Sequence, residues 1–232
     1  MGNNTAGQAA FEKANSLKDD GRTDEAIEEY RKAIDLNCNL AEAHNNLGIL
    51  YKEKGLREDA LAEYKKVIEL KYNLDQVYDN LGILYAEMGM YKKAIPAYEE
   101  GLKFNPKNAR IYNNLGIACD HIGELGKAIK FYEKAIELNP KMPEAHYNLG
   151  ISYGVIDKFQ DSIEELERAA GLDPLDPDIY FNLALSYSRA AMIDDAIDAY
   201  KEALEIWPDF EEARANLEIL YKRPKEERRR II

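Results

Sequence analysis

Asparagine returns along the chain at a fixed interval of 34 residues, and this row of carboxamides is the first set of side chains that could do chemistry. A carboxamide both donates and accepts hydrogen bonds. A row with constant spacing could therefore pair with successive peptide groups of an extended ligand, which is binding chemistry and not catalysis. The row consists of Asn46, Asn80, Asn114, Asn148, Asn182 and Asn216.

The histidines and cysteines do not assemble into a catalytic or metal site in the sequence. His44 and His146 occupy equivalent places three intervals apart, so we interpret them as packing residues that replace a tyrosine, and not as metal ligands. Cys38 and Cys119 are separated by more than two intervals, and we expect Cys119 to be a small buried residue. No phosphate-binding glycine loop, dinucleotide fingerprint or nucleophile elbow is present. We therefore predict that the chain is not an enzyme and uses no metal or cofactor.

The composition is that of a folded, acidic protein. Of 232 residues, 46% are hydrophobic and 32% are charged, which excludes a disordered chain. The 43 acidic residues outnumber the 31 basic ones, so the net charge of −12 repels nucleic-acid backbones. No apolar run approaches the ~20 residues of a membrane span, and the N-terminus does not resemble a signal peptide. The composition predicts a soluble cytoplasmic protein with peripheral membrane contact at most and no nucleic-acid partner.

The asparagine row belongs to a longer motif that recurs without insertion or deletion. The segment 46–51, Asn-Leu-Gly-Ile-Leu-Tyr, returns unchanged at 80–85 and in altered form at 114–119, 148–153 and 182–187. Two further sets keep the same period, one of small residues and one composed mostly of tyrosine. They are Ala60, Ala94, Ala128, Ser162 and Ala196, and Tyr64, Tyr98, Tyr132, Leu166 and Tyr200.

Each unit has the pattern of two packed helices. His44, Leu47, Gly48 and Tyr51 are spaced as one face of a helix. Gly48 and its equivalents have no side chain and allow a second helix to approach closely. Further glycines, such as Gly55, fall where a turn must reverse the chain. A single unit cannot bury its apolar face alone, so we expect stacked units with polar caps at the ends.

This combination resembles the tetratricopeptide repeat (TPR), which has Leu-Gly-x-x-Tyr in its first helix, Ala-x-x-x-Tyr in its second and a closing proline. The resemblance covers about nine-tenths of the chain. Repeat 1 departs from the pattern at Lys13 and Ala14, repeat 5 departs at Leu166, and repeats 1 and 2 lack the closing proline. The resemblance implies an all-α, right-handed α–α superhelix.

The register of the motif predicts the organisation of the whole chain. We expect six helix-turn-helix repeats of 34 residues over 7–210, followed by a capping helix over 211–221. Residues 1–6 form an N-terminal extension and 222–232 a basic tail. The expected repeats are 7–40, 41–74, 75–108, 109–142, 143–176 and 177–210.

In the TPR family, one face of the first helices lines the concave groove in which ligands lie. The resemblance places the asparagine row on this face, where it is similar to the asparagine ladder in the TPR superhelix of O-GlcNAc transferase. The catalytic domain of that enzyme has no counterpart in this sequence. A row of mostly isoleucine, two aromatic residues, one cation and one histidine complete the face. They are Ile83, Ile117, Ile151, Tyr147, Phe181, Arg110 and His121.

Two structural alternatives remain open for this face. The asparagines could bond to a neighbouring helix, and the isoleucines could pack against the following repeat. In the functional interpretation, the asparagines bind the ligand backbone and the apolar residues select its side chains.

The sequence therefore predicts a protein–protein interaction scaffold or adaptor that binds extended peptide segments of partner proteins. The alternative is a regulatory or substrate-presenting TPR module of a larger enzyme, such as a glycosyltransferase or kinase. The tail, 222–232, carries six basic and two acidic residues. We expect it to be able to dock onto the acidic surface of another copy and form a homo-oligomer whose contacts weaken with salt.

Overall fold

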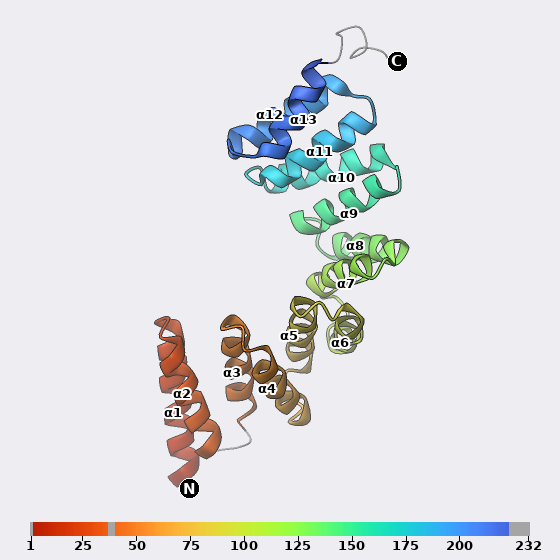
Figure 1. Ribbon diagram of the computed structural model, residues 1–232. Helices are drawn as coiled ribbons and strands as arrows, with labels where there is room; N and C mark the ends of the chain where they lie inside the picture. The colour runs from red at the N-terminus through yellow and green to blue at the C-terminus, as the bar shows by residue number, and fades with distance from the viewer. Residues whose placement is uncertain (1, 37–39, 223–232) are drawn as a thin grey trace. The chain divides into compact units, whose positions relative to one another are not determined.

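The computed structural model describes residues 2–36 and 40–222, and every regular element in these ranges is an α-helix (Figure 1). The described ranges contain thirteen helices and no strand, which confirms the predicted all-α fold. Cys38 and residues 223–232 of the basic tail lie outside these ranges. The helices are α1 (Gly2–Asp19), α2 (Thr23–Leu36), α3 (Ala41–Glu53), α4 (Arg57–Glu69), α5 (Leu74–Glu87), α6 (Tyr91–Phe104), α7 (Ala109–His121), α8 (Leu125–Leu138), α9 (Pro143–Val155), α10 (Phe159–Leu172), α11 (Pro177–Arg189), α12 (Ile193–Ile206) and α13 (Glu211–Lys222).

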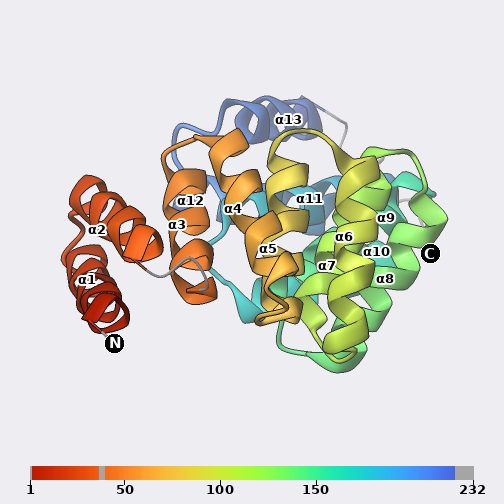
Figure 2. The same ribbon diagram turned by 90° about the horizontal axis from the view of Figure 1, so that it is seen from below.

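Successive helices form hairpins, for example α1 with α2, which lie side by side in both views (Figure 1, Figure 2). We call the odd-numbered helices of the hairpins A helices and the even-numbered ones B helices. Helix α1 begins at Gly2, inside the range 1–6 that the sequence predicts as an N-terminal extension. A residue with positive φ ends the turn of each hairpin. This residue is glycine in the first four hairpins, but Asp157 (φ 60°) and Ala191 (φ 62°) take its place in the last two.

The chain divides into two compact units, residues 1–107 and 108–232. In each unit, the B helix of one hairpin packs against the A helix of the next, as α2 does on α3 and α10 on α11. The core of each unit therefore runs between the hairpins as well as inside them. Tyr30, Tyr64 and Leu47 belong to the core of the first unit, and Leu166 and Tyr200 belong to that of the second.

A tyrosine of the B helix packs against a glycine of its own A helix. A Cβ atom added to Gly48 would lie 2.7 Å from Cε1 of Tyr64, which is closer than real Cβ contacts. Gly116 faces Tyr132 in the same way, and the Tyr132 ring is only 2% exposed. The two helices approach this closely because the glycine has no side chain. This is the close approach that the sequence predicts.

Replacing Gly116 by alanine should therefore destabilise the protein, because the new methyl group displaces the Tyr132 ring. We expect a loss of roughly 1–2 kcal/mol in the free energy of unfolding, measured by chemical denaturation. Repeats 1 and 6 carry Ala14 and Ala184 at this place, so the fold itself should persist. Gly126→Ala in α8 is the matched control. Its Cβ would meet no atom within 4 Å, and a change of at most about 1 kcal/mol in the stabilising direction is expected. Equal effects of the two substitutions would contradict this account.

The buried tyrosines also make stability depend on alkaline pH. Burial raises the pKa of Tyr30 from 10.0 to about 12. Burial likewise raises the pKa values of Tyr64, Tyr132 and Tyr200. Each of these groups ionises at a lower pH in the unfolded chain than in the folded one. Their stabilising contribution is thus complete below the unfolded pKa and is lost as the pH rises through the folded pKa.

We predict cooperative unfolding between about pH 10 and pH 12. The near-ultraviolet absorbance of tyrosinate and the helical circular dichroism should change together over this range. A tyrosinate signal that climbs smoothly through pH 10 while the helical signal stays constant would show that the tyrosines do not control stability.

Candidate functional site

The row of asparagines lies half-buried on the A helices and on α13, in both units. Four of its members use their amide nitrogen inside the protein. Nδ2 of Asn46 donates to the hydroxyl of Tyr30 at 3.2 Å and to Oδ1 of Asn15 at 3.3 Å. Nδ2 of Asn216 donates to the hydroxyl of Tyr200 at 3.1 Å. In both places the asparagine ties its helix to the B-helix tyrosine of the preceding repeat.

The next two asparagines bond to the preceding A helix instead. Asn182 follows the repeat in which Leu166 replaces the tyrosine, and its Nδ2 donates to the hydroxyl of Tyr147 at 3.1 Å and to the carbonyl oxygen of Asp178 at 2.8 Å. Nδ2 of Asn148 donates to Oδ1 of Asn113 at 3.1 Å. The amide nitrogens of these four asparagines thus bond to a neighbouring helix, as the structural alternative expects.

Asn80 differs from these four. Its Nδ2 atom and the hydroxyl of Tyr64 are both buried, and neither finds a hydrogen-bond partner among the described residues. The preceding connection between α4 and α5 is irregular. Lys71 and Asn73 both have positive φ there, and Tyr72 stands where later repeats carry proline. The hydrogen bond between asparagine and B-helix tyrosine that Asn46 and Asn216 make is therefore not formed by Asn80.

The side-chain oxygens of these asparagines differ from the nitrogens in their hydrogen bonding. In the described ranges, Oδ1 of Asn46, Asn148, Asn182 and Asn216 accepts no hydrogen bond from another residue. The internal bonds fix the orientation of each amide. They leave acceptors available, which match the N–H groups of a peptide backbone.

The apolar residues of the predicted face are divided between packing and open surface. Phe181 packs between repeats, with its ring centroid 4.9 Å from that of Phe210 and 5.8 Å from that of Tyr200. Tyr147 also packs against the core of the second unit. The isoleucines Ile83, Ile117 and Ile151 are half-buried, whereas Arg110 and His121 are exposed.

Two hollows in the second unit bring some of these residues together. One, of about 340 Å³, is lined by Ile117, Tyr147 and Asn148, among others. The other, of about 350 Å³, is lined by Ile151 and Asn182. Both volumes are at the lower end of the range for ligand sites. Each hollow combines apolar side chains with an asparagine of the row, and A helices of two successive repeats contribute to its lining.

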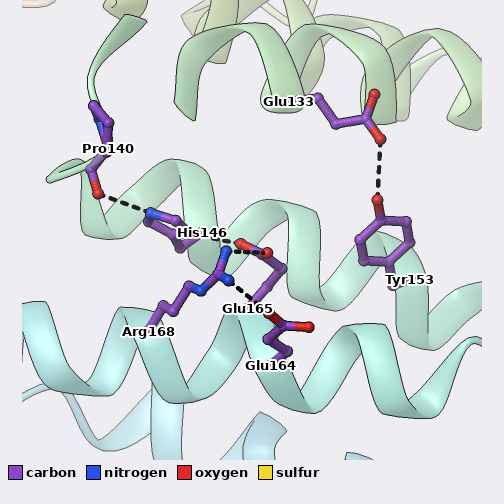
Figure 3. A network of polar contacts seen from close by, with 7 residues as sticks. All are labelled: Glu133, Pro140, His146, Tyr153, Glu164, Glu165 and Arg168. Carbon is purple, nitrogen blue, oxygen red and sulfur yellow. Dashed lines mark hydrogen bonds and ion pairs between the residues drawn. The ribbon is translucent and has the colours of Figure 1, made fainter. Parts of the chain in front are cut away.

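His146 is more than a packing residue, which corrects the interpretation from sequence. Its Nδ1 lies 2.6 Å from Oε2 of Glu165, and its Nε2 lies 3.0 Å from the carbonyl oxygen of Pro140 (Figure 3). Arg168 extends the network by donating to Glu165 at 2.9 Å. The His146 ring is 3% exposed and links α9 to α10 within one hairpin. Burial of a polar ring requires such partners.

His44 forms the same kind of pair three repeats earlier, in the first compact unit, with its Nδ1 at 2.5 Å from Oε2 of Glu63. Both pairs are separated by 19 residues in the sequence. In repeat 3 the same two places hold Tyr78 and Ala97. The sequence analysis missed this coupled exchange, although the spacing could have revealed it.

Three further observations concern the cysteine, possible metal ligands and membrane spans. Cys119 is 1% exposed and lies in the core, as predicted. The described ranges contain no cluster of three or more histidine, cysteine or acidic side chains that could hold a metal ion. Among the described helices, none combines the length and apolar character that crossing a membrane requires.

The His146–Glu165 pair should show coupling in a double-mutant cycle. His146→Tyr leaves Glu165 with Arg168 alone, and Glu165→Ala removes the partner of Nδ1 of the buried His146, so each should cost roughly 1–3 kcal/mol of unfolding free energy. The double variant copies the Tyr78–Ala97 pair of repeat 3, so it should lose less than the sum by at least about 0.5 kcal/mol. Unfolding in urea measures all three variants. Additive losses would mean that the two side chains do not stabilise each other.

Comparison with sequence models of protein families gives matches over most of this helical array. A TPR repeat model matches residues 14–55 and 84–119. Two tetratricopeptide repeat models match residues 109–142 and 177–210, and residues 41–74. The chain belongs to the tetratricopeptide repeat family. A comparison with curated protein sequences found no match.

Solved TPR structures share the fold of this TPR chain. One is YrrB, described as a TPR protein with an unusual peptide-binding site, which is 24% identical over 83% of this chain and 99% of YrrB, with a TM-score of 0.68. PilF of Pseudomonas aeruginosa is 18% identical over 94% of this chain and 100% of its own, with a TM-score of 0.80. MamA is 28% identical over 77% of this chain and 95% of its own, with a TM-score of 0.65. TPR proteins are generally non-catalytic modules, and the family supports an interaction scaffold.

Proposed function

We propose that this chain is an interaction scaffold or adaptor that binds an extended peptide segment of a partner protein along its A helices. The observation that carries the proposal is the pair of hollows in the second unit, each lined by apolar side chains beside an asparagine of the row. The hollows accept side chains of the ligand, while the carboxamides accept hydrogen bonds from its backbone. The peptide-binding site named for YrrB, a TPR protein of similar fold, supports the same class of ligand.

The spacing of the row suits an extended peptide. Packed helices lie ~8–10 Å apart, and an extended chain advances ~3.3 Å per residue. Successive asparagines within a unit can therefore meet about every third peptide group. Such contacts read the backbone, so selectivity comes from apolar residues such as Ile117, Ile151 and Tyr147. Self-association through the basic tail, 222–232, remains a separate part of this proposal, because almost all of that segment lies outside the described residues.

The test begins with selection of short unstructured peptides by the immobilised protein from a displayed library. Calorimetry then compares the wild type with the combined variant Asn114→Ala, Asn148→Ala, whose two changes lie in the second unit. Each hydrogen bond contributes ~0.5–1.5 kcal/mol net, so we expect a loss of roughly 1–3 kcal/mol of binding free energy. Stability should fall mainly by the single internal bond from Asn148 to Asn113.

Gln160→Ala is the matched control, because it removes an exposed amide from the B helix α10. Its affinity for the selected peptide should equal that of the wild type. If the combined variant melts far lower while its folded fraction binds normally, the asparagine row is structural and the proposed site is wrong.

A further inference from the structure

One repeat lacks the tyrosine that fills the space beside the asparagine row. Leu166 stands where the other B helices carry tyrosine, at Tyr30, Tyr64, Tyr98, Tyr132 and Tyr200. Leu166 is fully buried, and its Cγ lies 2.7 Å from the place of a Cβ on Gly150, so it covers the glycine as the tyrosines do. A leucine side chain ends before the position of a tyrosine hydroxyl. The space that the outer half of a tyrosine ring would occupy is left without an occupant from this helix.

The hollow of about 350 Å³ lies at this place. Its apolar walls come from Ile151 and Val155 of α9, Leu166 of α10 and Leu185 of α11. Val155 is 65% exposed, so its side chain is accessible to a ligand at this hollow. Asn182 lies at the same hollow and donates to Tyr147, so its amide is held without the missing tyrosine.

Charged groups also line this hollow. Arg189, in the last turn of α11, is exposed and forms no ion pair with any described residue. Other cations of the second unit, such as Lys134 and Lys201, pair with carboxylates on their own helices. Asp157, in the turn after α9, contributes one carboxylate to the lining. A guanidinium without an internal partner in an acidic protein complements a carboxylate of the ligand.

We propose that this hollow is a specificity pocket that takes one large apolar side chain of the partner peptide, from a residue that adjoins an acidic residue paired with Arg189. The pocket rests on the proposed peptide-binding function and assigns its sequence preference. The apolar side chain is buried against Ile151, Leu166 and Leu185, while the neighbouring carboxylate reaches the guanidinium. Asp157 repels that carboxylate and so limits the affinity.

Leu166→Tyr provides a sharp test because it restores the residue of the other repeats. The ring should pack over Gly150 as Tyr132 does over Gly116, and its hydroxyl should reach Asn182 as Tyr200 reaches Asn216. We therefore expect the variant to fold and to melt no lower than the wild type. The ring fills the pocket, so an apolar side chain of a ligand can no longer enter.

The probes are dye-labelled, alanine-based peptides with one phenylalanine followed by one glutamate, and two partners in which phenylalanine becomes alanine or glutamate becomes glutamine. Fluorescence anisotropy measures their affinities. The wild type should bind the phenylalanine peptide about tenfold or more tightly than the alanine peptide, as expected for burial of a large apolar side chain. Leu166→Tyr should abolish this difference.

Charge substitutions test the second half of the proposal. Arg189→Gln should remove the preference for glutamate over glutamine. Asp157→Asn should strengthen binding of the glutamate peptide, and asparagine tolerates the positive φ at this place. Methyl NMR signals of Ile151, Val155 and Leu185 should shift on addition of the phenylalanine peptide and not of the alanine peptide.

The outcomes separate the pocket from the proposed function. If folded Leu166→Tyr keeps the full preference for phenylalanine, or if Arg189→Gln keeps the full preference for glutamate, the pocket assignment is wrong. If the peptides nevertheless bind more weakly to the combined variant of Asn114 and Asn148, the peptide-binding function stands without the pocket. If the wild type binds none of the three peptides at millimolar concentrations, the pocket assignment is wrong, and the library selection then decides the function.

Discussion

The packing of a B-helix tyrosine on an A-helix glycine sets the geometry on which most other contacts of this chain depend. The glycine lets the ring approach the helix backbone, and the ring then fills the space between two helices that could not otherwise lie so close. In the first and last repeats, where Ala14 and Ala184 replace the glycine, the hydroxyls of Tyr30 and Tyr200 accept a hydrogen bond from the asparagine of the next helix. The tyrosine position therefore serves the hairpin in every repeat that carries it, and in these two repeats it also serves the junction with the following helix. Because a repeat cannot fold alone, both contacts must form for the array to be stable.

The sequence predicted those features that depend on local pattern. The sequence alone shows the 34-residue period, the helical spacing around Leu47 and Gly48, and the glycine at the close approach of the two helices. Each of these features follows from side-chain size and periodicity. Asp157 and Ala191 at positive φ were not foreseen, since the array holds them in a conformation that their own residue types disfavour.

The helices that carry the asparagine row could be predicted from the sequence, but the contacts of the row could not. The row of asparagines was placed on the A helices from spacing alone. Its internal bonds to Tyr30, Asn113 and Tyr147 depend on how neighbouring repeats settle against each other, which a single helix pattern does not contain. The His146–Glu165 pair was missed for a similar reason, since two residues separated by 19 positions become partners only after the hairpin forms. Pockets follow from gaps in packing, and the gap at Leu166 is visible only beside the tyrosines of the other repeats.

The contacts that vary in residue type between repeats lie inside a hairpin, whereas the contacts that join neighbouring repeats use nearly the same residue types throughout. The histidine–glutamate pair and its tyrosine–alanine substitute both lie inside a single hairpin, so repeats 2, 3, 5 and 6 each carry one of two matched versions. The tyrosine and asparagine that join neighbours are nearly uniform along the chain. A repeat can therefore be duplicated, lost or exchanged as a unit of 34 residues without breaking a matched pair. Repeat 5 differs in its tyrosine position, where Leu166 leaves Asn182 to bond with Tyr147. A gene that grows by tandem duplication would keep the pairs inside each hairpin intact, while the junction after repeat 5 marks one place where the array has become specialised.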